Sequence, residues 1–322
     1  MMQDYDATDP ESITRFARRL MGKTLRDLTN DEGSVGLQTV DSSKGSFGTA
    51  LEELYFGIRP GNEEGVPDFK EAKLELKSCP TLYKRQRLVV KERLVLSMID
   101  YMSLPEEEWE TSLFWKKNGD LLMVFYLHED QVKVMDLKIM LTGRWKFPAE
   151  DLLIIRSDWE RIKAKVAAGK ADELSEGDTL YLRACTKASS SRDRKRQPNS
   201  TRAAKPRAFS LRPTYVDSMI ERIRQKDIAS QLANSVVKSP DELTKRTFEQ
   251  LVEDKFEPYL GRSVEDIATE LGLSHDLSIK QSNALITRGI LGVKSKVAEF
   301  ERADVMTKSV LLENDGRLVQ SI

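Results

Sequence analysis

The residues whose types and spacing are best suited to catalysis are an aspartate, a glutamate and a lysine that lie close together in the sequence. Asp68 is followed, after six residues, by Glu75-Leu76-Lys77. In a β-strand Glu75 and Lys77 share one face, because successive side chains alternate between the two faces. Two carboxylates can bind a hard divalent cation that activates water and offsets phosphate charge, while an adjacent lysine holds the nucleophile or stabilises the pentavalent phosphorus. The pattern predicts metal-assisted phosphodiester hydrolysis; the alternative is a solvated strand face with alternating charges.

The elements around this trio predict a mixed α/β fold. Apolar residues from Phe47 to Tyr55 recur at helical spacing, which predicts a helix over 46–56. Glu52 would lie on a different side of this helix from the apolar stripe. The alternation of Leu74-Glu75-Leu76-Lys77 predicts a strand. Further strands of one sheet are predicted over 87–99, 121–128, 132–141 and 179–185. Further helices are predicted from Pro10 to Gly22, over 149–168, from Thr214, and from a capping box at Ser239 to about Glu257.

Length and composition exclude several classes of protein. The chain has 322 residues, enough for about two domains, and is 39% hydrophobic. No apolar run approaches the roughly 18 residues of a membrane span, and the charged N-terminus lacks a signal-peptide core. Two cysteines and two histidines are too few for a disulfide framework or a zinc cluster. We therefore expect a soluble, intracellular protein that does not contact a membrane.

A basic segment interrupts the otherwise balanced charge. The chain has 51 Lys and Arg against 52 Asp and Glu, so a basic surface must be local. The segment from Lys187 to Arg207 contains eight Lys or Arg, one Asp and no large apolar residue. This composition predicts a flexible basic loop that packs no core; an ordinary disordered linker is the alternative to a DNA-binding role.

An internal repeat predicts two domains. Residues Met21 to Leu28 are echoed by Leu260 to Ile267, and residues 68–78 align more weakly with 299–309. We therefore expect a first domain over 1–230 and a truncated, degenerate copy over 231–322. The alignment places Glu299, Met306 and Lys308 at the positions of Asp68, Glu75 and Lys77, respectively. Because a methionine thioether is a poor ligand for a hard cation, the copy is expected to be catalytically silent.

Several spaced motifs resemble one known family. They are Lys44-Gly45-Ser46-Phe47-Gly48, Leu51 to Gly57, Asp68 to Ala72, Leu74 to Lys77, Trp109 to Ser112 with Lys117, Tyr181-Leu182 with Cys185 to Lys187, and Arg207 to Leu211. In this order they resemble the MutH and Sau-type GATC endonuclease family over residues 10–225. The second, partial unit is similar to the non-cleaving C-terminal half of Sau-type restriction enzymes. The resemblance implies a restriction-endonuclease-like fold, a mixed sheet flanked by helices, and Mg²⁺-dependent cleavage of double-stranded DNA at GATC.

The resemblance also implies roles for individual residues. Asp68 and Glu75 match the metal ligands and Lys77 the catalytic lysine; Glu52, Lys44 and Lys117 match further active-site residues, although a solvated side chain is the alternative for each. Lys187 matches a base-contacting lysine, and Ser210 stands where MutH has a tyrosine associated with sensing adenine methylation. Phosphate contacts are expected from the basic loop, through Arg192, Arg194, Lys195 and Arg196.

Three functions remain open at this point. Cys185 and Thr186 replace the Arg-Pro that precedes the lysine in MutH, which favours the restriction branch: a type II enzyme of the bacterial cytoplasm, accompanied by a protective methyltransferase. The alternatives are a MutH-like strand-nicking enzyme of mismatch repair and an inactive DNA-binding remnant. Because GATC is palindromic, cutting both strands needs two facing recognition units, so self-association on DNA is expected.

Overall fold

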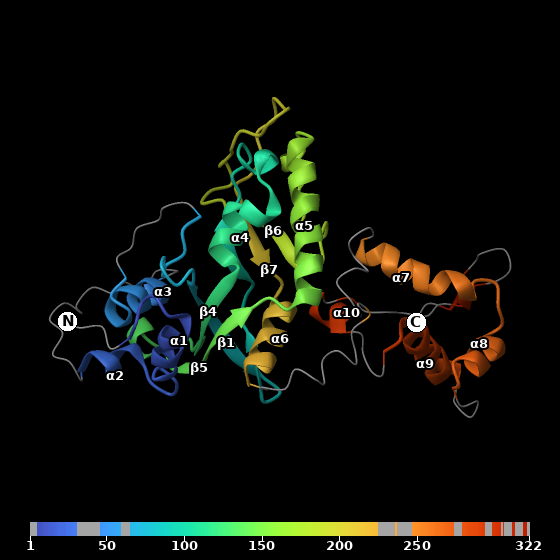
Figure 1. The fold of residues 1–322 in the computed structure, drawn as a ribbon, viewed down its shortest axis with the longest axis horizontal. Helices are drawn as coiled ribbons and strands as arrows, with labels where there is room; N and C mark the ends of the chain where they lie inside the picture. The colour runs from blue at the N-terminus through green and yellow to red at the C-terminus, as the bar shows by residue number, and fades with distance from the viewer. Residues whose placement is uncertain are drawn as a thin grey trace. The chain divides into compact units, whose positions relative to one another are not determined.

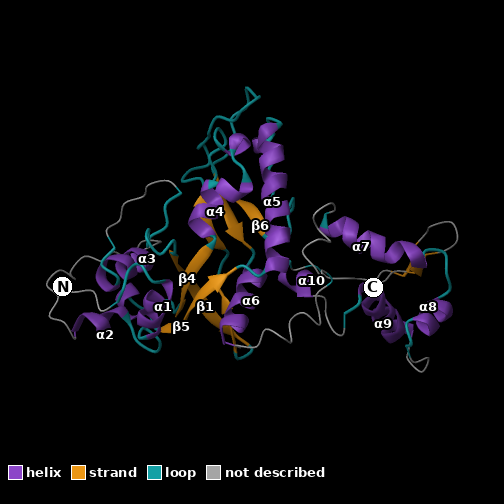
Figure 2. Ribbon diagram, in the orientation of Figure 1, coloured by secondary structure: helices purple, strands orange, loops and turns teal. Residues whose placement is uncertain are grey.

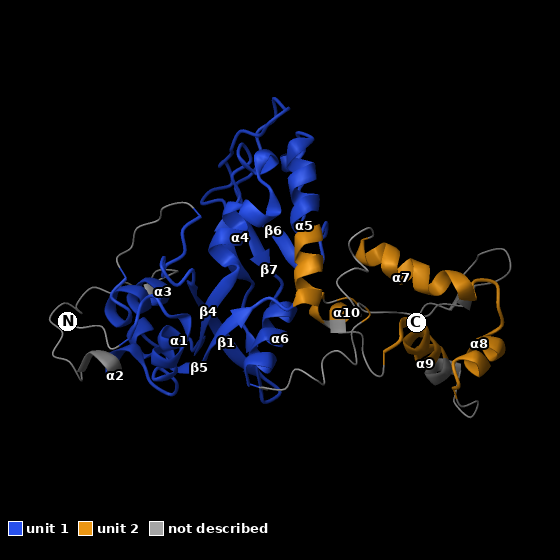
Figure 3. Cartoon of the chain, in the orientation of Figure 1, with its two compact units in different colours: residues 1–148, 158–226 blue, residues 149–157, 227–322 orange. Residues whose placement is uncertain are grey.

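The structure, a computed structural model, divides the chain into two compact units. One comprises residues 1–148 and 158–226 and the other residues 149–157 and 227–322 (Figure 3). The residues it describes are 5–30, 46–58, 65–224, 236, 247–273, 279–293, 298–303, 305, 311–312 and 318–320. Helix α5 (Ala149–Ala167) begins in the second unit and ends in the first.

Two small sheets form the centre of the first unit (Figure 1). The first has the order β2-β1-β4-β5, with β1 parallel to β4 and the other pairs antiparallel. The second is antiparallel, with the order β3-β7-β6. The strands are β1 (Glu75–Lys84), β2 (Arg87–Val90), β3 (Leu94–Met98), β4 (Asp120–Leu127), β5 (Ile139–Lys146), β6 (Leu182–Thr186) and β7 (Arg207–Leu211).

Helices flank these sheets, so the predicted mixed α/β fold class is confirmed, although the predicted strands divide between two sheets instead of forming one (Figure 2). The α-helices of the first unit are α1 (Pro10–Arg18), α2 (Leu25–Asn30), α3 (Ser46–Ala50), α4 (Leu113–Asn118) and α6 (Pro213–Arg224), with α5 shared. Single 3₁₀ turns are η3 (Leu104–Glu106), η4 (Trp109–Thr111), η5 (Val134–Asp136) and η6 (Ala171–Glu173). The predicted N-cap of α1 is confirmed, because the Asp9 carboxylate accepts hydrogen bonds from the backbone N–H groups of Glu11 and Ser12.

Four predicted elements differ from the structure. The single helix over 46–56 is α3 followed by a π-helical segment, η2 (Leu51–Tyr55). The strand over 87–99 is two strands, β2 and β3, which belong to different sheets, and the strand over 132–141 begins only at Ile139. The helix predicted from Ser239 has its N-cap at Thr247, where Thr247 and Gln250 form the capping box; residues 237–246 lie outside the described residues.

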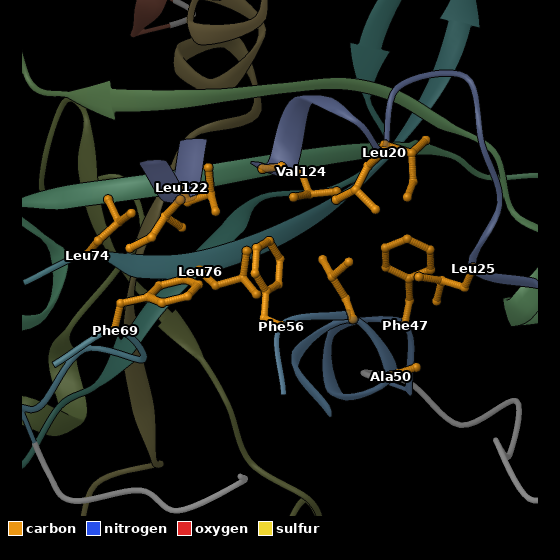
Figure 4. Close-up of a cluster of buried hydrophobic side chains, with 14 of the residues drawn as sticks. Leu20, Leu25, Phe47, Ala50, Phe56, Phe69, Leu74, Leu76, Leu122 and Val124 are labelled. Carbon is orange, nitrogen blue, oxygen red and sulfur yellow. The ribbon is translucent and has the colours of Figure 1, made fainter. Parts of the chain in front are cut away.

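One apolar cluster holds the N-terminal helices against the first sheet. Figure 4 shows Phe47, Ala50 and Phe56 facing Leu76 of β1 and Val124 of β4. All five of these residues are buried. Because side chains alternate along β1, burial of Leu74 and Leu76 in this cluster turns Glu75 and Lys77 to the opposite face. The hydrophobic core therefore fixes the direction in which the candidate catalytic residues point.

The second unit is mainly helical. Its elements are α7 (Phe248–Phe256), η9 (Glu257–Tyr259), α8 (Val264–Glu270), α9 (Ile279–Leu291), α10 (Ala298–Arg302) and the strands β8 (Leu311–Leu312) and β9 (Leu318–Gln320). Ile267, Ala268 and Ile286 form a small apolar cluster. Within the described part of the chain, no helix is long and apolar enough to cross a bilayer.

Among the described residues, the two copies of the predicted repeat have similar local structure at the first aligned segment and different local structure at the second. Gly22 between α1 and α2 has φ of +80°, and Gly261 between α7 and α8 has φ of +75°. Residues 299–302 are helical, however, whereas their counterparts 68–71 lie in a bridge and a turn. Met306 and Lys308 lie outside the described residues. The degenerate copy over 231–322 therefore stays a prediction.

Candidate active site

A cavity of about 590 Å³ brings together five of the six predicted catalytic residues. The π-helical segment η2 contributes Glu52, the turn before β1 contributes Asp68, and α4 contributes Lys117. The first and third residues of β1, Glu75 and Lys77, also line the cavity. Lys44, the sixth, lies outside the described residues.

A tight turn explains the spacing between Asp68 and Glu75. Phe69 and Leu74 form an antiparallel bridge, with N–H to O distances of 2.9 and 3.2 Å. Lys73 closes the turn with φ of +52°. The turn folds Asp68 back onto β1, where its Oδ2 accepts a hydrogen bond from the Leu76 N–H at 2.9 Å, and its own N–H donates to Glu75 Oε2 at 3.1 Å. The Asp68 carboxylate therefore holds the backbone of Leu76, and the Glu75 carboxylate holds the backbone of Asp68.

The approach of α3 to β1 places Glu52 at the same cavity. A Cβ atom at Gly48 would lie 3.1 Å from Ser78 Oγ, so glycine allows this close contact. In η2 the Phe56 N–H donates to the Leu51 carbonyl at 3.2 Å, an i to i+5 bond, while Phe56 is buried in the apolar cluster. A π turn of this kind is common at functional sites because it rotates the following side chains relative to a regular α-helix.

Two lysines compensate part of the acidic charge. Lys77 Nζ lies 2.5 Å from Glu75 Oε1, and Lys117 Nζ lies 3.5 Å from the same oxygen. Lys117 also donates to the Val66 carbonyl at 3.3 Å. Both side chains are mostly buried, with exposed fractions of 18% and 15%. These contacts hold two ammonium groups at the cavity wall with little rotational freedom.

Burial, together with the remaining acidic charge, raises the pKa of two carboxyl groups. Burial, followed by the charges of Asp68 and Glu75, raises the pKa of Glu52 to about 7, although Lys77 and Lys117 oppose this shift. Burial and the charge of Asp68 also raise the pKa of Glu75 against the opposing effect of Lys77. Carboxylates that resist ionisation in this way would be stabilised by an added cation.

The donor set fits a hard divalent cation. Glu52, Asp68 and Glu75 supply only oxygen atoms, which Mg²⁺ and Ca²⁺ prefer. Among the described residues no group of three His, Cys, Asp or Glu side chains is placed to hold a metal ion. An ion held here by one or two carboxylates would complete its shell with water or phosphate oxygens, as Mg²⁺ commonly does.

The cavity has acidic members that the sequence analysis missed. Asp100 and Glu107 line it from the connection between β3 and α4. Glu107 Oε2 accepts a hydrogen bond from the Leu113 N–H at 2.9 Å, so it anchors the first turn of the helix that bears Lys117. Asp100 accepts from the Met102 N–H at 2.7 Å. No periodicity marks such turn residues, because only the tertiary fold places them here.

The basic segment connects β6 and β7, and its expected lack of packing is wrong. Gln197, Ala204 and Pro206 are buried, and Lys195 and Ala204 exchange two backbone hydrogen bonds at 2.7 and 2.9 Å. Five of the predicted DNA-binding side chains are nevertheless exposed: Lys187, Arg192, Arg194, Lys195 and Arg196. The segment is thus internally hydrogen-bonded and presents its basic side chains to solvent.

Ser210 lies in a different environment from these five residues. It is completely buried in β7, the middle strand of its sheet, and its hydroxyl donates to the Arg183 carbonyl at 3.5 Å. Neither face of a covered middle strand reaches solvent at this position. Ser210 is therefore not among the exposed candidates for contact with DNA.

Comparisons with known proteins show which family the sequence resembles. Residues 56–158 match the model of the MutH family, described as the DNA mismatch repair enzyme MutH. The chain is 32% identical over 315 residues to the type II restriction enzyme Sau3AI of Staphylococcus aureus, covering 93% of this chain and 61% of that protein. It is 27% identical over 219 residues to the DNA mismatch repair protein MutH of Shewanella woodyi, covering 66% of this chain and 93% of that protein.

A second MutH relative, from Vibrio parahaemolyticus, is 26% identical over 224 residues, covering 66% of this chain and 94% of that protein. The chain thus spans about three fifths of the length of Sau3AI and nearly the full length of the MutH proteins. The resemblance predicted from the motifs is confirmed, because residues 56–158 match the MutH family model and the chain is similar to Sau3AI and to MutH proteins.

Proposed function

We propose that this MutH-family chain is a Mg²⁺-dependent endonuclease that hydrolyses double-stranded DNA at GATC sites. The observation that carries the proposal is the convergence of Asp68, Glu75 and Lys77 on one cavity, with Glu52 and Lys117 beside them. Relatives named as a restriction enzyme and as mismatch repair proteins support a DNA substrate.

In this mechanism each residue has a role that its position supports. Asp68 and Glu75 would hold Mg²⁺, which supplies activation of water and neutralisation of phosphate charge when bound. Lys77, held by Glu75 at the cavity wall, orients the attacking water or stabilises the developing charge on phosphorus. Lys117, anchored on Val66 and Glu75, adds positive charge beside the scissile phosphate. Glu52 completes the acidic side of the cavity.

DNA recognition would fall to the segment between β6 and β7. Lys187 is exposed at its base, where its backbone N–H donates to the Pro206 carbonyl at 2.8 Å. Lysine readily donates to guanine acceptors in the major groove, which is a frequent specific contact. Arg192, Arg194, Lys195 and Arg196 would contact phosphates and supply sequence-independent affinity.

A type II restriction enzyme is the favoured role. The alignment with Sau3AI extends over 93% of the chain and so into the second unit, whereas the alignment with MutH covers 66%. Such an enzyme would act in the bacterial cytoplasm beside a methyltransferase that protects host GATC sites. Two chains would meet on the palindromic site so that both strands are cut. Strand nicking is the second candidate, because the MutH proteins align over nearly their whole length.

A plasmid assay separates these functions. The purified chain is incubated with unmethylated and adenine-methylated plasmid, with Mg²⁺ or with EDTA, and supercoiled, nicked and linear DNA are quantified. We expect linear product that requires Mg²⁺ and GATC. Nicked product alone would support the MutH-like role, and bound but intact plasmid would identify a DNA-binding remnant.

Neutralising the basic segment tests its proposed contact with phosphates. We expect simultaneous replacement of Arg192, Arg194, Lys195 and Arg196 by alanine to weaken binding to all duplexes. The slope of log K against log salt should flatten by about 3 to 4, since each phosphate contact contributes about 0.9. Lys187→Ala should instead reduce discrimination between GATC and other duplexes. Fluorescence anisotropy over a salt series measures both effects, and an unchanged slope in the quadruple variant would mean that the segment is only a linker.

A further inference from the structure

The 3₁₀ turn η6, which follows α5, holds the basic segment through a buried glutamine. Gln197 has an exposed fraction of 5%, and its Oε1 accepts a hydrogen bond from the Ala171 N–H at 2.5 Å. Its Nε2 donates to Asp172 Oδ1 at 2.9 Å and to the Arg202 carbonyl at 2.8 Å. One amide group therefore joins the turn after α5 to both arms of the segment. A buried amide group whose two N–H hydrogens and oxygen all form hydrogen bonds holds the surrounding groups in place.

A glycine at the same turn makes room for the segment's backbone. Gly169 has φ of +70°, and a Cβ atom there would lie 2.5 Å from the Asn199 carbonyl oxygen and 2.9 Å from the Asn199 carbonyl carbon. The Asn199 side chain donates to the Ala167 carbonyl at 2.9 Å. Backbone atoms cannot swing aside as a flexible side chain can, so any side chain at residue 169 must displace the segment.

The other end of the segment starts at the rim of the cavity. Thr186 pairs with Arg207, and the next residue of β7, Ala208, pairs with Met98, which lines the cavity. The buried Tyr101 donates its hydroxyl hydrogen to the Lys205 carbonyl at 2.5 Å. The segment is thus fixed both beside the candidate active site and on the end of α5.

The acidic residue inside the segment also serves its conformation. The Asp193 carboxylate accepts hydrogen bonds from the backbone N–H and the hydroxyl of both Ser189 and Ser190, at 2.5 to 2.8 Å. These bonds lower the pKa of Asp193, so the group stays ionised in place. The charge itself would repel DNA phosphates, but the four bonds order the chain around it.

We propose that Gly169 and Gln197 are positioning residues for DNA recognition, and that the end of α5 is the platform on which the basic segment is preorganised. The inference rests on the proposed function, because it assumes that DNA is the substrate. A segment of this length that was unordered in the free protein would lose conformational entropy on binding DNA. The platform removes that cost before the encounter and sets where Lys187 and the arginines stand.

A pair of glycine variants of the full chain tests the platform. Gly169→Ala introduces both left-handed strain and the clash with Asn199, whereas Gly22→Ala, at φ of +80° with no atom within 4 Å, introduces the strain alone. Binding to a GATC duplex and to a scrambled duplex is measured in EDTA over a salt series, and the single-turnover cleavage rate is measured at saturating DNA.

We expect Gly169→Ala to weaken binding to the GATC duplex about tenfold, to reduce discrimination and to change the salt slope. The cleavage rate at saturating DNA should stay that of the wild type. Gly22→Ala should match the wild type in all three binding measurements. Gln197→Met, which keeps the length of the side chain without its hydrogen bonds, should act in the same direction as Gly169→Ala and serves in its place if that variant does not fold.

Equal affinity, discrimination and salt slope in Gly169→Ala and Gly22→Ala, or in Gln197→Met and wild type, would overturn the inference. A wild-type chain that neither binds nor cleaves duplex DNA would instead overturn the proposed function, which is a separate and visible outcome.

Discussion

Asp68→Asn is expected to lower the Mg²⁺-dependent cleavage rate at least about 1000-fold, which corresponds to a loss of about 4 kcal/mol of transition-state stabilisation. The asparagine keeps an oxygen that can accept the Leu76 N–H, so the turn before β1 should stay intact. It loses the negative charge that a divalent cation requires. Single-turnover cleavage of a duplex with one GATC site measures the rate, and anisotropy in EDTA measures binding, which should change little.

Glu71→Gln is the matched control for this variant. Glu71 is exposed and lies in the same turn, three residues from Asp68, and it does not line the cavity. Its rate should equal that of the wild type. Lys77→Ala should lose cleavage as Asp68→Asn does, although it removes no proposed metal ligand. Wild-type rates in Asp68→Asn or Lys77→Ala would remove this cavity from consideration as the hydrolytic site.

Asp158→Ala is expected to lower the free energy of unfolding by about 3–5 kcal/mol. The buried Asp158 carboxylate on α5 accepts hydrogen bonds from the N–H groups of Leu180, Tyr181 and Leu182, at 2.9, 2.6 and 2.9 Å. Each buried N–H left without an acceptor costs about 1–3 kcal/mol, and partial relaxation reduces the sum. These bonds hold the start of β6, the strand that leads to Lys187. Urea unfolding followed by circular dichroism gives the free energy.

Glu160→Ala, two residues along the same helix, is the control for Asp158→Ala and should change stability by no more than about 0.5 kcal/mol. A comparable loss in both variants would mean that the helix, and not the three hydrogen bonds, determines the effect.

The pH dependence gives a second test of Asp158. Burial raises its pKa from 3.8 to about 7, although the three backbone hydrogen bonds oppose this shift. Because the folded-state pKa lies above the unfolded one, the stabilising contribution is complete below pH 4 and is lost as the pH rises through 7. Asp158→Asn has no such titration, so the stability difference between wild type and variant should shrink between pH 5 and pH 8. A constant difference would contradict the raised pKa.

Local patterns in the sequence predict the centre of the site because its geometry is local. Strand alternation separates Leu74 and Leu76 from Glu75 and Lys77, and one tight turn brings Asp68 onto β1. The helical spacing around Glu52 is nearly correct, because a π segment still buries Leu51 and Phe56. Such features depend on a few neighbouring residues, and the apolar core then fixes which face they present.

What the sequence does not predict depends on contacts between distant segments. The residues between 87 and 99 are rich in β-branched and large apolar side chains on either side of Lys91-Glu92-Arg93. Pairing with β1 on one side and with β7 on the other places the two strands in different sheets. The basic segment has the composition of an unpacked loop, yet Gln197 finds its partners at Ala171 and Asp172, about 25 residues away. Ser210 is buried because β7 is a middle strand, which no local pattern indicates.

Site-specific hydrolysis at GATC can be measured by mapping cleavage of two short duplexes that differ only at one site. One contains a single GATC and the other has the same four bases in scrambled order; each is incubated with the purified wild-type chain and Mg²⁺, and the product ends are sequenced. We expect cleavage at one defined position at GATC, none in the scrambled duplex and none in EDTA. Intact GATC duplex under conditions where the chain is folded and bound, or equal cleavage of both duplexes, would contradict a GATC-directed endonuclease built on Asp68, Glu75 and Lys77.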